Sequence, residues 1–274
     1  MGKKLLKSAA LHILALICVA ATLLPLVFMV STSFKVPAEI FTKEPVIIPE
    51  APTMDNYLEL FRRIDFGRCF ANSLIVALGL TLFSLFVNSL AAYAFAKLAF
   101  PGREKLFALL LVTMMVPGQV TMMPVFIILK HLGLLNSYLG LIIPGGAGVF
   151  AIFMLRQFMV DVPEALLESA RIDGCGELRI YWSIMLPLCR PVLATLLIFN
   201  FMGAWNEFLW PLIVMLSESK YTLPVALANL NGQYNAEWGL LMAGSVIVIL
   251  PVVLVFLMAQ KHYIKGIAAG AVKG

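Results

Sequence analysis

The sequence predicts an all-helical integral membrane protein with six transmembrane helices and both termini in the cytoplasm. Of its 274 residues, 61% are hydrophobic and only 13% are charged, and the mean hydropathy is +0.95. A water-soluble domain is close to half apolar and a quarter charged, and a fold of this size could not bury so much apolar surface in water. Lipid is therefore the solvent for much of this chain.

Six apolar segments stand out, and each carries almost no charge. A helix needs about 20 apolar residues to cross a bilayer, and backbone inside lipid must satisfy its own hydrogen bonds, which favours helices of this length over shorter alternating strands. The first segment is too long for a signal-peptide core and no convincing cleavage site follows, so we expect a retained helix. A shorter amphipathic helix is expected at 55–64, in the first outer loop, either lying at the membrane surface or packed on the helix bundle. The predicted spans are residues 11–30, 70–96, 106–129, 138–159, 191–216 and 238–259.

The distribution of basic residues predicts the orientation. With the amino terminus inside, nearly twice as many Lys and Arg residues fall on the inner side as on the outer side. Inner loops carry the excess of Lys and Arg, so both termini are expected in the cytoplasm. The same loops account for the net charge of +5, and no nucleic-acid partner is expected.

The sequence carries no motif for catalysis. It lacks the GxxxxGK[ST] loop that cradles nucleotide phosphates, and it lacks the HExxH and GxSxG patterns of hydrolases. His12, His131 and His262 are scattered, and the four cysteines form no CxxC pair, so no metal or cofactor is expected on this chain. The glycine-rich stretch 145–148 predicts close helix packing instead.

Polar and helix-breaking residues in two spans suit a transport pathway. Pro117 predicts a kink in the third span, which is tolerated beside a cavity or beside neighbouring helices, and both alternatives stay open. Glu207 follows Arg190 by about 17 residues, or about 25 Å along a helix, in the outer half of the membrane. A charge there usually faces a cavity or a partner. The candidate path residues are Asn200, Trp205, Asn206 and Glu207, with hydrogen bonding between helices or subunits as the alternative.

The inner segment 161–187 predicts a capped helix followed by a turn. Asp161 can cap this helix, with Pro163 in its first turn and Glu164 three residues after the cap, as in a capping box. Gly174 can take the left-handed conformation that ends the helix. A second short helix is expected over 177–186, stopping at Pro187.

The first of these helices presents two kinds of surface. Glu164, Glu168 and Arg171 lie along one stripe, at spacings of four and three residues. Small residues allow another surface to approach closely, which suits insertion into a partner's groove; a solvated loop is the alternative. The small residues are Ala165, Ser169, Ala170 and Gly174.

Several stretches resemble one family. The block Glu168-Ser-Ala-Arg-Ile-Asp-Gly174, followed by Ile184-Met-Leu-Pro187, resembles the EAA loop of ABC importer permeases, with Ser169 where the family has alanine. The form Ala-Arg-Ile-Asp-Gly is typical of the carbohydrate-uptake branch. Further stretches resemble maltose- and glycerol-phosphate-type permeases: Trp205-Asn-Glu-Phe208 with Pro211, Gly232-Gln-Tyr, Trp238-Gly, Met242-Ala243 and the tail 266–274.

The resemblance implies a type I ABC importer permease fold in the inner membrane of a bacterial cell. Its domains would be 1–69 (first helix and outer loop), 70–262 (permease core with the EAA loop) and 263–274 (cytoplasmic tail). The implied partners are two copies of an ATP-binding subunit, which would hold the ATP and Mg²⁺, a second related permease subunit and an extracytoplasmic solute-binding protein. This chain would be non-catalytic.

The resemblance also implies residue roles. Glu168 would pair with a basic residue of the ATPase, and Gly174 would supply the turn between the helices. The implied docking residues are Glu164, Glu168, Ser169, Ala170, Arg171, Asp173, Gly174 and Pro187, and the implied tail contacts are Gly270, Lys273 and Gly274. The outer loop 217–237 would reach the binding protein through Asn231, Gln233 and Tyr234, with an ordinary exposed loop as the alternative.

The function expected on these grounds is import of a carbohydrate that an extracytoplasmic binding protein delivers, driven by ATP hydrolysis on a separate subunit. The carbohydrate would be a sugar, an oligosaccharide or a glycerol-phosphate-like solute. The alternative is a stand-alone secondary transporter or channel, which usually needs ionisable relays or inverted repeats with broken helices; only Glu207 lies at depth, and no clear repeat relates the halves. A membrane enzyme would need a nucleophile, a base or a metal constellation that the sequence lacks.

Overall fold

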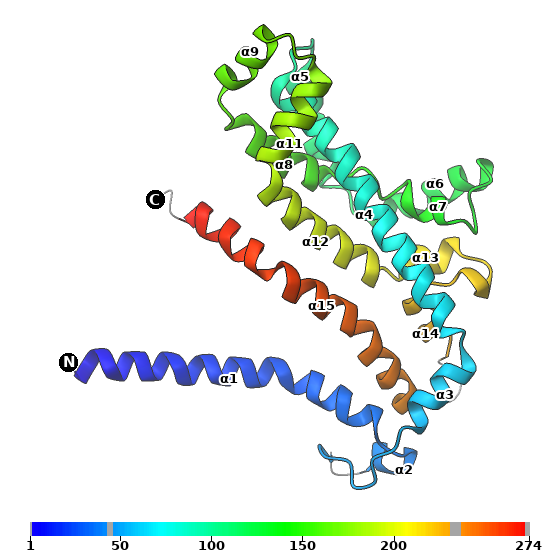
Figure 1. The fold of residues 1–274 in the computed structure, drawn as a ribbon. Helices are drawn as coiled ribbons and strands as arrows, with labels where there is room; N and C mark the ends of the chain where they lie inside the picture. Colours follow the sequence, from blue (N-terminus) through cyan, green and yellow to red (C-terminus); the bar gives the residue numbers. More distant parts are fainter. Residues whose placement is uncertain (1, 43–45, 231–236, 272–274) are drawn as a thin grey trace. The chain divides into compact units, whose positions relative to one another are not determined.

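All regular structure in the described part of the chain is helical, as the composition predicts (Figure 1). This computed structural model describes residues 2–42, 46–230 and 237–271, and no strand occurs in these ranges. The chain divides into two compact units. Unit 1 comprises Met1–Phe66 and Ala226–Pro251, and unit 2 comprises Gly67–Val225 and Val252–Gly274.

Unit 1 is held together around a short helix that the sequence predicts. Asn56 of this helix donates from Nδ2 to the carbonyl oxygens of Ser33 (3.0 Å) and Lys35 (2.9 Å), and Arg63 pairs with Glu237 at 2.9 Å. These contacts join the end of the first helix and the start of the last one to the short helix. The elements are α1 (Gly2–Ser33), α2 (Pro37–Ile40), α3 (Asp55–Arg63) and the first part of α15 (Trp238–Ala271).

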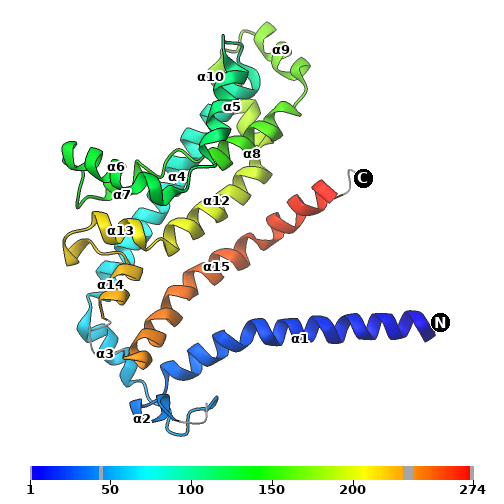
Figure 2. The same cartoon turned by 180° about the vertical axis from the view of Figure 1, so that it is seen from behind.

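Unit 2 is built along α4 (Phe66–Lys97), a helix of 32 residues. Figures 1 and 2 show α5 and α9 at the carboxyl end of α4, and α13 toward its amino end. The other elements are α5 (Arg103–Thr113), α6 (Gly118–His131), α7 (Tyr138–Ile142), α8 (Val149–Val160), α9 (Glu164–Ile172), α10 (Glu177–Ile180), the π-helical turn η1 (Tyr181–Met185), α11 (Leu186–Leu188), α12 (Arg190–Asn206), α13 (Leu209–Val214), the 3₁₀ turn η2 (Glu218–Lys220) and α14 (Leu223–Asn229), which ends in unit 1.

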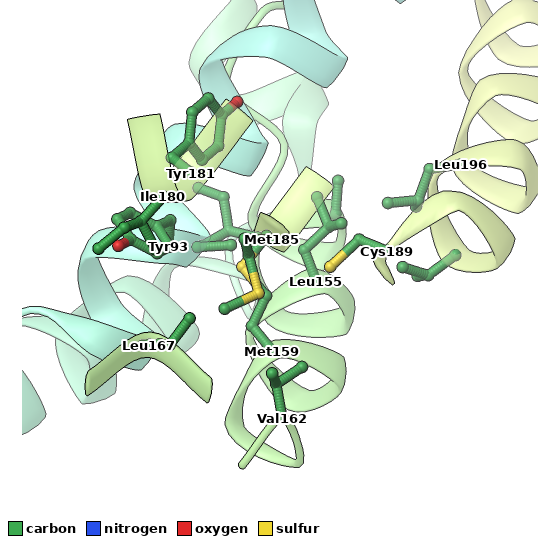
Figure 3. Packing of buried hydrophobic residues seen from close by; sticks show 14 of the residues in the cluster. Tyr93, Leu155, Met159, Val162, Leu167, Ile180, Tyr181, Met185, Cys189 and Leu196 are labelled. Atoms are coloured by element: carbon green, nitrogen blue, oxygen red, sulfur yellow. The ribbon is translucent and has the colours of Figure 1, made fainter. Parts of the chain in front are cut away.

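A buried hydrophobic cluster lies at the carboxyl end of α4. Figure 3 shows Leu155 and Met159 of α8 packed beside Met185 of η1, with Leu167 of α9 and Tyr93 of α4 nearby. All five side chains are buried. This cluster fixes the position of α9 on unit 2.

The membrane-spanning helices differ in part from the prediction. Three described helices are long and apolar enough to cross a bilayer: Ser8–Ser33, Phe66–Lys97 and Trp238–Met258. Counting two strongly bent pairs as one span each brings the number to five: α5 with α6, bent by 102°, and Glu177–Leu188 with Arg190–Asn206, bent by 80°. The kink predicted at Pro117 in the third span is confirmed, since α5 and α6 meet there at a sharp bend. The predictions of unbroken helices over 138–159 and 191–216 are wrong, because these segments divide into α7 and α8, and into α12 and α13.

Proline positions account for two of these breaks. A proline ring clashes with the carbonyl group four residues before it and supplies no N–H group. Helix α5 ends at Thr113, four residues before Pro117. Helix α12 ends at Asn206, so the first residue outside it is Glu207, four residues before Pro211. Glu207 accordingly has an extended backbone conformation, with φ −66° and ψ 127°.

Glycines in the connection between α7 and α8 let it approach α4 closely. A Cβ atom at Gly145 would lie 2.7 Å from Leu80, and one at Gly146 would lie 2.3 Å from the ring of Phe83. The prediction of close packing for this stretch is therefore confirmed, although the glycines lie between two helices and not within one.

Substitution of Gly140 in α7 should destabilise the fold. A Cβ atom there would lie 2.4 Å from the backbone oxygen of Leu134 and 3.2 Å from Cγ1 of Val214, and a backbone atom cannot move aside cheaply. We expect Gly140→Ala to cost about 1–3 kcal/mol, measured as a lower thermal unfolding midpoint of the purified protein in detergent at a fixed scan rate.

Gly118→Ala is the matched control for this measurement. Nothing lies within 4 Å of the position of its added Cβ, and alanine favours a helix over glycine. An unchanged midpoint in Gly140→Ala would show that the close approach at α7 is not a constraint on the fold.

Candidate functional site

The inner loop, residues 161–187, forms the predicted pair of helices with different boundaries. The capping-box prediction is wrong: Pro163 is the N-cap residue of α9 and makes no side-chain cap, while Asp161 is the C-cap residue of α8. The reason is that α8 continues to Val160, which leaves Asp161 at its end. The second helix does not stop at Pro187, because α10, η1 and α11 follow without a gap up to Leu188.

The turn at Gly174 is confirmed. Its φ is +81°, a conformation that favours glycine because other side chains are strained there. The N–H of Cys175 donates to the carbonyl of Ala170 (2.9 Å), and the N–H of Gly174 donates to that of Arg171 (3.0 Å). This is the Schellman arrangement, which satisfies the last carbonyls of α9 and turns the chain sharply.

One side of α9 faces the hydrophobic cluster. Leu167 is fully buried and Ala170 is 7% exposed, and both pack with Ile180, which follows the turn. Ala170 therefore contacts its own fold, and its prediction as a docking contact is corrected to a packing role. Pro187 is half-buried.

A chain of charged and polar groups ties the loop to α4. Arg171 donates from Nη1 to Glu164 Oε1 (3.0 Å) and from Nε to Glu177 Oε1 (2.8 Å). Lys97, at the end of α4, donates to Glu164 Oε2 (3.2 Å) and to the carbonyl of Val162 (2.7 Å). The hydroxyl of Tyr93, one turn earlier on α4, donates to Glu177 Oε2 at 2.6 Å.

These contacts set the charges of the loop. The bond from Arg171, supported by Lys97, holds the pKa of the Glu164 carboxyl below its ordinary value. The bonds that Arg171 makes to Glu177 and Glu164 raise the pKa of the guanidinium. The ion pairs are therefore fully charged at neutral pH.

The opposite side of α9 and the turn are exposed. Glu168 and Ser169 are exposed, and Glu168 makes no ion pair with any described residue. Ile172 is 86% exposed and Leu178 is 71% exposed. Exposed apolar side chains at the turn therefore lie beside the unpaired carboxylate of Glu168, on a helix whose other side is bonded to its own fold. Such a surface is suited to a protein partner.

Two adjoining cavities lie further along unit 2, at the helix breaks. The first has a volume of about 240 Å³ between α4, α12 and α13, and its lining includes Asn200, Glu207 and Trp210. The second has a volume of about 390 Å³ beside α6 and α7, and it shares Glu207 and Trp210 with the first. Gln119 and other residues that follow the Pro117 break line this second cavity, which favours the cavity alternative for that break.

A family model decides the identity of this architecture. The model described as the binding-protein-dependent transport system inner membrane component matches residues 89–267, which include the whole inner loop and most of the residues that line the cavities; Leu80 and Val76 of the linings lie before this range. The chain belongs to this family of transport permeases.

Individual relatives cover most of this permease. The arabinooligosaccharide transport permease AraQ of Bacillus subtilis is 41% identical over 83% of this chain and 82% of its own. The sn-glycerol-3-phosphate transport permease UgpE of Yersinia pestis is 31% identical over 93% of this chain and 94% of its own. A chain in the crystal structure of a bacterial ABC transporter involved in alginate import has the same fold, with a TM-score of 0.83 and 24% identity over 93% of this chain and 96% of that chain.

The predicted path residues of the permease do not all lie together. Asn200 and Glu207 line the first cavity. Trp205 is 1% exposed and packs against Phe70 and Phe201, with ring centroids 5.4 and 5.9 Å away, so its prediction as a path residue is corrected to a core role. Asn206 is exposed and donates to the carbonyl of Met202 (2.8 Å).

Some predicted site residues fall outside the described ranges. Asn231, Gln233, Tyr234, Lys273 and Gly274 all do, and Gly270 lies in the last turns of α15. Among the described residues, no group of three or more His, Cys, Asp or Glu side chains could hold a metal ion.

Sequence reasoning missed the residues that anchor the loop and shape the cavities. Lys97 and Tyr93 contact partners that are 67 and 84 positions away, and nothing local in the sequence predicts such pairs. Trp210 directly precedes Pro211, and Gln119 lies two residues after Pro117. Both could have been found from these positions, because broken helices in a membrane usually line a cavity.

Loss of the Arg171 guanidinium should loosen α9. Both ion pairs are partly exposed, so we expect Arg171→Gln to cost the loop about 1 kcal/mol. The measurement is hydrogen–deuterium exchange, in which the α9 amides should exchange roughly fivefold faster than in the wild type.

Arg179→Gln removes the same charge from the same loop and serves as the control, because Arg179 is exposed and forms no ion pair with a described residue. Equal exchange rates in the two variants would contradict an anchoring role for Arg171.

Acid should loosen the same helix. The pKa of Glu164 in the folded chain lies below its ordinary value, so its ion pairs stabilise the loop fully above about pH 4.3, the ordinary value for Glu, and lose this effect as pH falls through the lowered value. After correction for intrinsic rates, protection of α9 should stay constant from pH 7 to about pH 5 and fall below about pH 4. Constant protection down to pH 3 would argue against this role of Glu164.

Proposed function

We propose that this chain is the membrane-spanning permease subunit of an ATP-driven importer, and that its inner loop docks on a separate ATP-binding subunit. The observation that carries the proposal is the two-sided α9: its inner side is anchored to α4 by the bonds of Lys97 to Glu164 and to the carbonyl of Val162, and its outer side is exposed. When a partner displaces a loop of this kind, the displacement is passed to α4. Membership of a binding-protein-dependent transport family supports this role.

The docking contacts proposed for the ATP-binding subunit are those that the structure leaves accessible. Glu168 would form an ion pair with a basic residue of that subunit, and Ile172 would enter an apolar part of its cleft. Ser169 and Asp173 are exposed beside them. Glu164, Arg171 and Gly174 serve the same contact indirectly, since they hold the shape of the loop. The tail residues Gly270, Lys273 and Gly274 are proposed as a further contact with the ATP-binding subunits.

The proposed topology has six crossings with both termini in the cytoplasm of a bacterial cell. The three continuous spans and the two bent pairs supply up to five candidate crossings, and we assign the sixth to the segment of α7 and the apolar helix α8. The excess of basic residues in the inner loops supports the orientation. In this arrangement residues 1–69 would hold the first transmembrane helix and the outer loop, residues 70–262 the permease core, and residues 263–274 the cytoplasmic tail.

The substrate class proposed is carbohydrate. The named relatives transport arabinooligosaccharides and sn-glycerol-3-phosphate, and the alginate importer has the same fold. These substrates share a polyhydroxylated skeleton but differ in charge. A solute-binding protein outside the cell, a second permease subunit and two ATP-binding subunits that carry the ATP and Mg²⁺ would complete the transporter.

A stand-alone transporter or channel is the alternative function. Reconstitution of this chain in vesicles with and without its ATP-binding subunits separates the two. Uptake of sugar by the chain alone, with no need for ATP, would overturn the proposed function.

Reversal of charge at Glu168 should uncouple the transporter. We expect Glu168→Lys to reduce ATP-driven uptake and co-purification of the ATP-binding subunit at least tenfold, because a partner cation would then face a like charge. The variant should insert in the membrane normally, since Glu168 is exposed and bonds to no described residue.

Lys105→Glu is the matched control, because Lys105 is an exposed residue in the first turn of α5. Its uptake should equal that of the wild type. Wild-type uptake in Glu168→Lys would mean that the loop does not dock through this carboxylate.

A further inference from the structure

Glu207 holds the only charged side chain among the residues that line the two cavities, all of which lie in the described ranges. It lines both cavities, because the chain is extended there between α12 and α13. No Lys or Arg side chain joins it in either lining. Anything that occupies these cavities therefore meets a negative charge without a compensating positive one.

The carboxylate is held in place but not neutralised. The N–H of Trp210 donates to Glu207 Oε1 at 3.2 Å. Oε2 has no partner among the described residues. Glu207 is exposed in the isolated chain, so its charge acts on the cavity space and not on a buried partner.

The rest of the polar lining suits neutral hydroxyl groups. Trp210 donates from Nε1 to the carbonyl of Gly140 (3.2 Å), which fixes the orientation of the indole ring. Asn200 donates from Nδ2 to the hydroxyl of Ser84 (3.2 Å), which leaves its amide oxygen free to accept a bond from a ligand. Gln119 and Thr121 add an amide and a hydroxyl in the second cavity. A flat aromatic surface with a few acceptors is a suitable binding site for an uncharged sugar.

We propose that the carboxylate of Glu207 acts as a charge filter, so that the cavities admit uncharged saccharides and reject saccharides that carry a carboxylate or a phosphate. Apolar walls strengthen the repulsion, because a charge acts over a longer distance where water is partly excluded. The inference rests on the proposed function and names the substrate class of the same pathway.

The test measures a ratio of two uptake rates in the complete transporter. The wild-type complex with its binding protein is reconstituted in vesicles, and neutral arabino-, xylo- and malto-trioses are screened for ATP-driven uptake. The transported triose is then compared with its aldonate, in which the reducing end is oxidised to a carboxylate. Because the binding protein is the same in every preparation, its own preference cancels when variants are compared by the ratio of aldonate to neutral uptake.

Glu207→Gln should raise this ratio about tenfold, because the amide keeps an oxygen for the Trp210 N–H but removes the charge. Gln119→Glu adds a carboxylate to the second cavity, in the first turn of α6 where an acidic residue is favourable, and it should lower the ratio. Glu218→Gln removes an exposed carboxylate outside both cavities and should leave the ratio unchanged.

A wild-type ratio in both Glu207→Gln and Gln119→Glu, with neutral uptake retained, would overturn the charge filter while leaving the proposed function intact. If Glu207→Gln fails to assemble, the Gln119→Glu ratio decides alone. If the wild-type complex transports none of the three trioses, the charge filter for neutral saccharides is overturned, while ATP-driven uptake of another solute would leave the proposed function intact.

Discussion

The two bonds of Arg171 are the constraint on which the inner loop depends. Through Glu164 and Glu177 they join the segments before and after the Gly174 turn, and through Lys97 and Tyr93 those segments are joined to α4. Residues 76 and 80 of the same helix line the first cavity. Residue 97 lies about 25 Å along the helix from residue 80. A displacement of α9 therefore reaches the cavity wall through one continuous helix, without a flexible joint between them.

The helix breaks and the cavities have the same cause. Backbone groups freed by a break cannot face lipid, so broken helices in a membrane protein lie beside other protein or beside a water-filled space. The helix breaks before Pro117 and Pro211 both border the cavities. The break before Pro117 places Gln119 in a cavity lining, and the break before Pro211 places Glu207 there. Proline thus places polar groups at a depth where a continuous apolar helix would offer none.

The sequence predicted the features that depend on one residue and missed those that depend on distant partners. Gly174 could be predicted as a left-handed turn because few other residues adopt that conformation. The kink at Pro117 could be predicted from the proline, but the break before Pro211 was not, and proline alone does not decide the outcome. Pro25, Pro124 and Pro251 lie inside helices, so the surrounding packing determines whether a proline breaks the helix. The prediction that Trp205 lines a pathway was wrong. Its polar neighbours in the sequence suggested a pathway, but the side chain is buried against Phe70, which is far away in the sequence.

The charge of Glu207 is not explained by the stability of the fold. The residue follows α12 at its carboxyl end, where the helix dipole disfavours a negative charge, and its one bond, to the N–H of Trp210, could be made equally well by a glutamine. A neutral side chain would therefore fit this position at no structural cost. The carboxylate acts instead on the space in front of it, which belongs to the solute's path in the proposed function. It differs in this from Glu164, Arg171 and Glu177 of the inner loop, whose charges are matched to each other.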